Sequence, residues 1–197
     1  MNPITHGLIG WTLASSIKVT PRERAMVTLA GLVPDVDGLG LVVDMINKTM
    51  GKTTDYWGEY HHILGHNLGL ALLCTGGALI AAKHRVKTAL MVFVSFHLHL
   101  LADVVGARGP DGFQWPIPYF YPFSDTVQLT WEGQWPLNGW PNILITVLLL
   151  AWMFYCAWRK GLSPLGLVSN RAEQQLIATL RGRFGEPSSM GLHKGNN

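Results

Sequence analysis

The feature that most constrains the fold is an apolar run from Thr88 to Val105 that carries a histidine and an aspartate near its far end. Its length is close to the roughly 20 residues with which a helix crosses a bilayer. His99 and Asp103 are four residues apart, so on a helix both side chains leave the same face and can bind one cation. A buried carboxylate needs such a cation or a hydrogen-bonded neutral histidine. Taken alone, the pair favours a neutral histidine that is hydrogen-bonded to the carboxylate. The case for a metal therefore depends on the rest of the chain.

Two further apolar runs, Ile63 to Ala82 and Pro141 to Trp158, complete three predicted transmembrane helices. Hydrophobic residues make up 48% of the chain and charged residues 14%, which favours a membrane protein over a soluble domain. The net charge is +3, but no basic stripe or nucleic-acid motif accompanies it, so we expect no nucleic-acid partner. Both cysteines lie alone in apolar runs, which leaves nitrogen and oxygen as metal ligands. We therefore predict an all-α, polytopic membrane helical bundle.

The N-terminal region adds two shorter apolar helices. Residues 4 to 17 predict the first, with His6 in its first turn, and this helix is too short to cross a bilayer alone. Residues Thr20 to Glu23 have the spacing of a capping box, with proline at the first helical position. They predict a second helix that runs to Val33, where another proline follows.

A polar turn after the second helix carries two candidate ligands. The segment Pro34 to Gly38 places Asp35 and Asp37 between a proline and a glycine, where two carboxylates can converge on a hard or borderline cation. An acidic surface turn is the alternative interpretation.

A second polar segment, Tyr60 to Asn67, holds three histidines within six positions. His62 and His66 share a helical face by their spacing, whereas His61 requires the chain to bend before the helix starts. Histidines that gather at a membrane interface without binding anything are the alternative.

The basic residues orient the predicted helices independently of the proposed ligands. Three basic corners, Lys18 to Arg24, Lys83 to Lys87 and Arg159 to Lys160, can face the cytoplasm together. The candidate ligands then share the opposite layer: His6, Asp35, Asp37, His61, His62, His66, His99 and Asp103. The long connection from Gly106 to Trp140 is rich in aromatic residues and proline, and we expect it to form a lid at the same face.

The chain divides, in this interpretation, into a membrane-embedded domain over residues 1–160 and a cytoplasmic tail over residues 161–197. An amphipathic helix is predicted at about Asn170 to Phe184, followed by a disordered end. The basic tail helix can recruit a partner or lie on anionic lipid.

Taken together, these motifs resemble the YdjM-like family of bacterial inner-membrane proteins, which are described as metal-dependent hydrolases. The resemblance covers about residues 1 to 125 and includes Thr5-His6, the segment Leu32 to Asp37, the histidine-rich segment that ends at His66, and His99-x-x-x-Asp103 before a Trp-Pro loop. The family's middle pattern, His-Arg-Gly-x-Thr-His-Ser, matches His61 and His66 and places His62 at its arginine. It therefore implies His61 as a ligand and His62 as a group that supports the site or contacts substrate.

That family is in turn similar to the zinc-dependent phospholipase C and zinc single-strand nuclease superfamily of all-helical phosphodiesterases. By position, this similarity implies zinc ligands at His6, Asp35 or Asp37, His61 or His66, His99, and Asp103. The soluble enzymes add a later histidine and an H-x-x-x-E motif, but only His193 follows Asp103 in this chain. We therefore expect one or two metal ions rather than three.

The function expected from these features is hydrolysis of a phosphoester or lipid-linked substrate by a metal-activated water in the bacterial inner membrane. Asp35, Asp37 or Asp55 can accept the proton of the water, and His62 or Arg108 can bind a phosphate oxygen. The multi-pass topology would put the metal site at the periplasmic face and the amphiphilic substrate beside the bilayer.

Two other functions fit the same residues. A non-catalytic membrane protein could bind or transport metal ions or protons, although the cytoplasmic halves of the predicted spans show no second ionisable layer. A structural bundle could use its histidines to stabilise an interface. The sequence does not specify the substrate, the metal or the oligomeric state.

Overall fold

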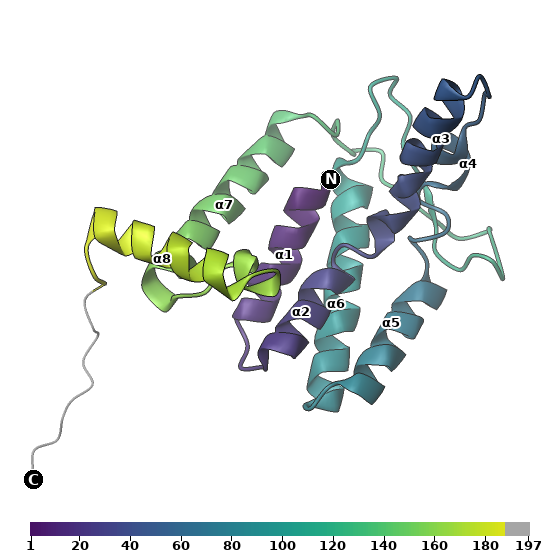
Figure 1. The fold of residues 1–197 in the computed structure, drawn as a ribbon. Helices are drawn as coiled ribbons and strands as arrows, with labels where there is room; N and C mark the ends of the chain where they lie inside the picture. Colours follow the sequence, from purple (N-terminus) through teal and green to yellow (C-terminus); the bar gives the residue numbers. More distant parts are fainter. Residues whose placement is uncertain (188–197) are drawn as a thin grey trace, which may run out of the picture. The chain divides into compact units, whose positions relative to one another are not determined.

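The computed structural model describes residues 1–187, which are mostly helical (Figure 1). The predicted all-α class is confirmed, apart from one pair of very short strands. The elements are α1 (Pro3–Ser15), α2 (Pro21–Ala30), the 3₁₀-helix η1 (Pro34–Leu39), α3 (Gly40–Thr49), α4 (Tyr56–Tyr60), α5 (Leu68–Ala81), α6 (Arg85–Gly106), β1 (Ile117–Pro118), β2 (Gln128–Leu129), α7 (Trp140–Lys160), the 3₁₀-helix η2 (Pro164–Leu167) and α8 (Asn170–Phe184).

The chain forms two compact units, residues 1–149 and the part from residue 150 onward, so that the division falls inside α7. In the second unit, Ser169 caps α8, whose bounds confirm the predicted tail helix. The disordered end predicted after this helix falls largely on residues 188–197, outside the described residues. The predicted domains, 1–160 and 161–197, stay predictions.

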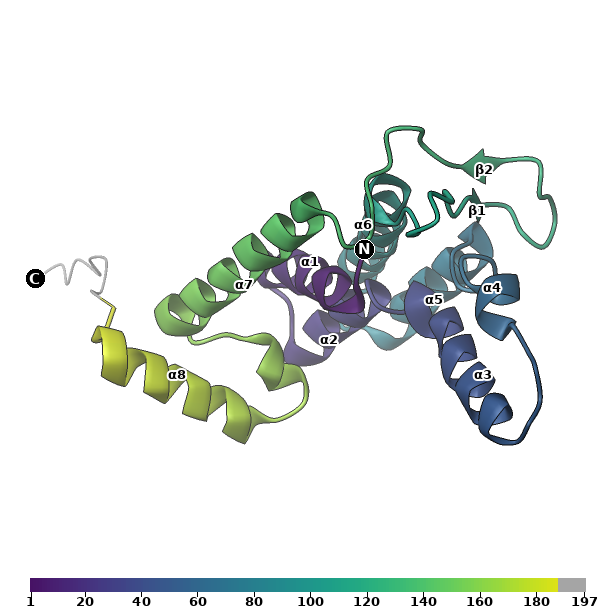
Figure 2. The ribbon, with the colours of Figure 1, turned by 90° about the horizontal axis from the view of Figure 1, so that it is seen from above.

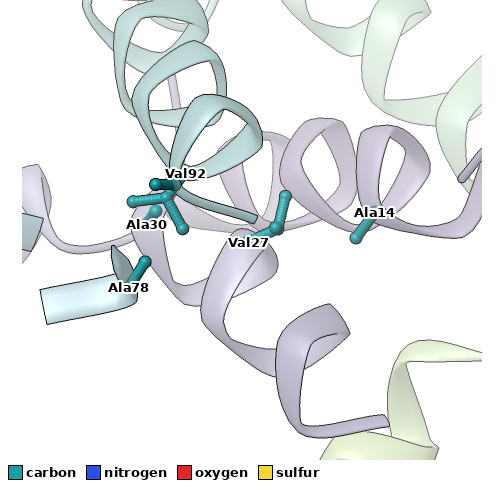
Figure 3. Close-up of a cluster of buried hydrophobic side chains, with 6 residues drawn as sticks. Ala14, Val27, Ala30, Ala78 and Val92 are labelled. Atoms are coloured by element: carbon teal, nitrogen blue, oxygen red, sulfur yellow. The ribbon is translucent and has the colours of Figure 1, made fainter. Parts of the chain in front are cut away.

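In the first unit, α6 packs against α1, α2 and α5 (Figure 1). Small and branched side chains from all four helices meet in one buried cluster, which Figure 3 shows in close-up: Ala14, Val27, Ala30, Ala78, Ala89 and Val92. Two glycines bring the backbones especially close. A Cβ atom on Gly10 would lie 2.9 Å from Ser95 Oγ, and one on Gly31 would lie 3.1 Å from the carbonyl oxygen of His6. Close approach of this kind is typical of helices in membrane proteins.

The predicted capping box lies at one end of this helix group. Thr20 and Glu23 cap α2 reciprocally, which confirms the prediction. The buried carboxylate of Glu23 also accepts a hydrogen bond from the backbone amide of His84, which precedes α6. The ammonium of Lys87 donates to the carbonyl oxygen of Lys18 over 2.9 Å. The first two predicted basic corners therefore lie together.

Two helices, α6 and α7, are long and apolar enough to cross a membrane, and the bent pair Pro21–Ala30 and Pro34–Thr49 is a third candidate with a 62° bend. The predicted span Ile63 to Ala82 is wrong at its start. The helix begins only at Leu68, because Asn67 leaves the helical conformation and its side chain accepts a hydrogen bond from the amide of Leu70. The 14 residues of α5 extend about 21 Å, less than the roughly 30 Å of a hydrocarbon core.

Hydrogen bonds to the ends of neighbouring helices hold the connection from α6 to α7 in place. Strands β1 and β2 pair antiparallel. The carbonyl oxygen of Tyr119, next to β1, accepts a hydrogen bond from the amide of Leu68, the first residue of α5. The amide group of Asn142 donates to the carbonyl oxygen of Gly106 at the end of α6. This connection therefore lies over the end of the bundle at which α6 finishes.

Candidate metal centre

The eight candidate ligands named from the sequence gather at one end of the first unit. They come from the start of α1, from η1, from the segment between α4 and α5, and from the last turns of α6, and Figure 1 shows the start of α1 beside the end of α6. This end is opposite the two basic corners. The helix arrangement therefore brings together residues up to 97 positions apart, such as His6 and Asp103.

Asp103 is the centre of the cluster and is only 2% exposed. Its Oδ1 atom lies 3.0 Å from Nε2 of His6 and contacts the amino group of Met1. Its Oδ2 atom lies 3.0 Å from Nε2 of His99 and 3.3 Å from Nε2 of His66, yet it accepts no hydrogen bond from any described residue. A buried carboxylate oxygen surrounded by imidazole nitrogens, but without a donor, is a suitable metal ligand.

The hydrogen bonds made by the Nδ1 atoms of His99 and His66 explain why their Nε2 atoms donate none to Asp103. Nδ1 of His99 donates to the carbonyl oxygen of Gly31 over 2.9 Å, and Nδ1 of His66 donates to Oδ2 of Asp37 over 3.0 Å. In the neutral rings, both Nε2 atoms therefore carry lone pairs, and they lie only 3.1 Å apart. Two lone pairs at this distance repel one another unless a proton or a metal ion lies with them. Ligand nitrogens on a tetrahedral zinc ion are about 3.3 Å apart, because each Zn–N bond is about 2.0–2.1 Å.

The pKa of His66 shows how strongly this place attracts positive charge. Burial alone would lower the pKa of the ring, but the carboxylates of Asp103 and Asp37 outweigh burial and raise it to about 9. His62 behaves differently, because burial and the neighbouring His66 lower its pKa to about 3. His62 is therefore neutral at pH 7 and can offer a lone pair.

The two carboxylates of η1 take different places. Asp37 accepts hydrogen bonds from Nδ1 of His61, from Nδ1 of His66 and from the amide of Gly65, so it orients the histidine segment. Asp35 instead directs Oδ1 to within 3.6 Å of Nε2 of His99, and its buried Oδ2 has no hydrogen-bond partner. Of the two alternatives left open by the sequence, Asp35 is the one near the ligand atoms.

The histidine segment does not form the helix that would place His62 and His66 on one face. His62 has a left-handed backbone with a φ of +67°, which is rare for a residue with a side chain and often marks functional sites. This bend turns Nε2 of His62 to within 3.9 Å of Oδ2 of Asp103. His61 instead stacks on Trp57 and bonds to Asp37. The preference for His61 over His62 as a ligand does not match this placement.

Two groups of side chains in the described part of the chain can each hold a metal ion, and they share Asp103. Within each group the ligand atoms lie within 4.8 Å of one another. The groups are His6, Asp35, His99 and Asp103, and His62, His66 and Asp103.

Other residues proposed from the sequence lie outside these groups. The carboxylate of Asp55 caps α4 by accepting a hydrogen bond from the amide of Gly58. The guanidinium of Arg108 donates to the carbonyl oxygen of Glu132. The sequence interpretation also missed Gly31 and Gln134, whose backbone carbonyl and side-chain amide bond to His99 and to the backbone of Asp103. Neither residue type signals such a role before the fold is known.

A cavity of about 460 Å³ opens next to the shared aspartate. Asp35, His61, His62 and Asp103 supply acidic and imidazole groups to its lining, and the rings of Trp57 and Trp115 form part of its walls. Among the described residues that line it there is no lysine or arginine. A substrate in this cavity would meet the carboxylates and imidazoles at one place and apolar walls around it.

Comparison with known proteins identifies the family. A sequence model described as "YdjM inner membrane protein" matches residues 1–179, which include every residue of the candidate metal centre. Neither the curated proteins nor the solved structures contain a significant match to this chain. Because the match extends over most of the chain, the protein belongs to the family of YdjM inner membrane proteins.

Proposed function

We propose that the protein is a membrane-bound, metal-dependent hydrolase that uses one or two zinc ions. The observation that carries the proposal is that the Nε2 atoms of His66 and His99 lie next to each other and next to Oδ2 of Asp103. The Nδ1–H group of each ring donates its hydrogen bond to another residue. Nitrogen and carboxylate ligands suit zinc, and hydrogen bonds from the outer ring nitrogens orient such ligands.

One ion could bind His66, His99 and Asp103 together, whereas two ions would share Asp103 and divide the two histidines between them. His6, Asp35 and His99 would complete one site, and His62 and His66 the other. The second group offers only three protein ligands, which leaves a position for water or substrate, as in catalytic zinc sites.

When bound, the metal supplies a nucleophilic water at neutral pH and a positive charge for the phosphoryl or acyl oxygen of the substrate. Asp35 lines the cavity, and its Oδ2 atom has no hydrogen-bond partner, so this carboxylate can accept the proton of that water. His62 is neutral and lines the same cavity, where it can contact the substrate. Asp37 holds the histidine segment in position, and the two tryptophans give the cavity apolar walls.

Phosphoesters with an apolar part are the first substrates to test. The resemblance to zinc-dependent phospholipase C suggests the phosphoester, and the apolar walls of the cavity suit an acyl or prenyl chain. No lysine or arginine lines the described cavity, and the amino group of Met1 is paired with Asp103, so the metal centre would supply most of the positive charge for the phosphate. We place the centre at the periplasmic face, since the basic corners at the other end fit the cytoplasm.

The alternative is a membrane protein that binds or transports metal ions without catalysis. Transport needs ionisable groups along a path, and α2 does carry a buried carboxylate, Glu23, at the other end of the bundle. However, both of its oxygens accept hydrogen bonds from backbone amides, those of Thr20 and His84, so it serves as a cap.

The test is turnover of a phosphodiester by purified protein, stripped with a chelator and reloaded with zinc. We expect metal-dependent hydrolysis that falls about 100-fold or more in Asp103→Asn. His97→Ala is the matched control, because His97 lies on the same helix but bonds to Phe93 and Tyr119 outside the cluster. Wild-type protein that binds zinc and moves it across proteoliposomes, without hydrolysing any phosphoester, would support the alternative.

A further inference from the structure

Helix α3 exposes an apolar face that no described residue covers. None of its residues is buried, and its large apolar side chains, from Val43 at 44% to Met45 at 62%, are strongly exposed. The exposed set is Leu41, Val42, Val43, Met45 and Ile46. Figure 2 shows α3 beside α4 and extending away from α1 and α2. Such a surface is unusual unless something apolar lies against it.

The polar side of the same helix is covered by the chain itself. Asp44 accepts hydrogen bonds from the hydroxyl of Thr54 and from the amides of Tyr56 and Trp57, and the amide group of Asn47 donates to Thr54. Residues 52–57 are therefore held against one side of α3. Among residues 1–187, the helix thus has a partner for its polar face and none for its apolar face.

The start of this apolar face adjoins the metal-centre cavity. Leu39, the residue before α3, lines the cavity and is 59% exposed. The other exposed residues of the lining are Pro3, Pro110 and Leu137, which are apolar as well. The residue that directly precedes the exposed side of α3 is therefore also part of the cavity lining.

We propose that the apolar face of α3 lies in the lipid bilayer and that the apolar chain of the substrate reaches the cavity from the lipid past Leu39. The bilayer is the occupant because the pair formed by α2 with η1 and α3 is long and apolar enough for a bent membrane segment, in an inner membrane protein. Lys48 in α3 and Lys52 just after it line one shallow hollow, and their long side chains can reach the lipid–water interface from an apolar helix face. The access route rests on the proposed function, but the position of α3 does not.

Site-directed quenching tests both parts without any assay of turnover. Single cysteines replace Leu39, Ile46 or Lys48 in a variant that lacks Cys74 and Cys156, and each carries a bimane label. The protein is reconstituted in vesicles of phosphatidylethanolamine and phosphatidylglycerol, with or without phosphatidylcholine brominated in its acyl chains. Iodide serves as the aqueous quencher.

Labels at residues 39 and 46 should lose most of their fluorescence to the brominated lipid and little to iodide, whereas the label at residue 48 should show the reverse. Quenching of residue 46 by iodide alone would overturn the proposal, because α3 would then lie in water. Protection of residue 46 from both quenchers, with cross-linking between copies, would overturn it in favour of a second copy as the occupant. Lipid quenching at residue 46 with iodide quenching at residue 39 would overturn the access route alone.

Kinetic measurements distinguish a failure of this proposal from a failure of the proposed function. In Val42→Gln, which changes the exposed face of α3 and no residue of the cavity lining, hydrolysis of a phospholipid in vesicles should lose about 10-fold in kcat/KM, while hydrolysis of a short soluble phosphodiester stays within about twofold. Equal losses for both substrates would contradict access from the lipid. A wild-type protein that hydrolyses neither substrate would contradict the proposed function and leave the quenching result on α3 standing.

Discussion

Gly65 lies so close to Pro34 that a Cβ atom at residue 65 would overlap the carbonyl oxygen of the proline. The amide of Gly65 also donates to Oδ2 of Asp37 over 2.9 Å. The backbone of the histidine segment thus packs directly on η1. This contact sets the positions of His66 and Asp37 relative to each other, and so the geometry of the candidate metal centre depends on it.

Gly65→Ala should therefore disturb the centre without removing any ligand. We expect a loss of about 1–3 kcal/mol in the free energy of unfolding, since the added methyl group has no room, together with weaker metal binding. Thermal unfolding in detergent and zinc titration measure the two effects. Gly76→Ala is the control, because a Cβ atom there meets nothing within 4 Å, and it should be neutral or stabilising. Equal behaviour of the two variants would show that the contact is unimportant.

The left-handed backbone of His62 predicts a difference between two variants that both lack the imidazole. Glycine adopts a φ of +67° without strain, whereas alanine does not, so His62→Gly should be more stable than His62→Ala by about 1 kcal/mol. Denaturant unfolding of the two metal-free variants measures the difference. If the alanine variant is as stable as the glycine variant, the bend is absent in solution.

Substitution of Asp35 and substitution of Asp55 should have very different effects on the rate of hydrolysis. Asp35→Asn should lower hydrolysis by about 100-fold or more, because it removes the cavity carboxylate that can accept a proton. Asp55→Asn should retain turnover within about threefold, since asparagine caps a helix as well as aspartate does. The pair is assayed with the same soluble phosphodiester, and abolition of activity in Asp55→Asn would show that the cap is not its main role.

Local signals in the sequence predicted much of the fold. The capping box at Thr20 and the tail helix from Asn170 were found because their determinants lie within one or two turns. The helix that carries His99 and Asp103 was found because its apolar run is long. The predicted gathering of the candidate ligands at one end, opposite the first two basic corners, also agrees with the structure.

Long-range contacts account for what the sequence did not reveal. The run from Ile63 to Ala82 has the composition of a span, but the turn at His62 and the cap at Asn67 shorten the helix. Asp35 and Asp37 look alike in the sequence, but in the fold Asp37 bonds to Nδ1 of His66 and to the amide of Gly65, whereas Asp35 approaches Nε2 of His99 and lines the cavity. The exposed face of α3 likewise depends on which of its sides the following loop covers.

The most direct test of the metal centre is the zinc content per chain of protein purified in detergent without chelator. Wild type and His97→Ala should contain one or two equivalents, Asp103→Asn should lose them, because Asp103 belongs to both groups of ligands, and His66→Ala should lose at least the equivalent that His66 binds. No zinc in the wild type, and none taken up when zinc is added back, would contradict the account. The same conclusion would follow if all four proteins bound equal amounts.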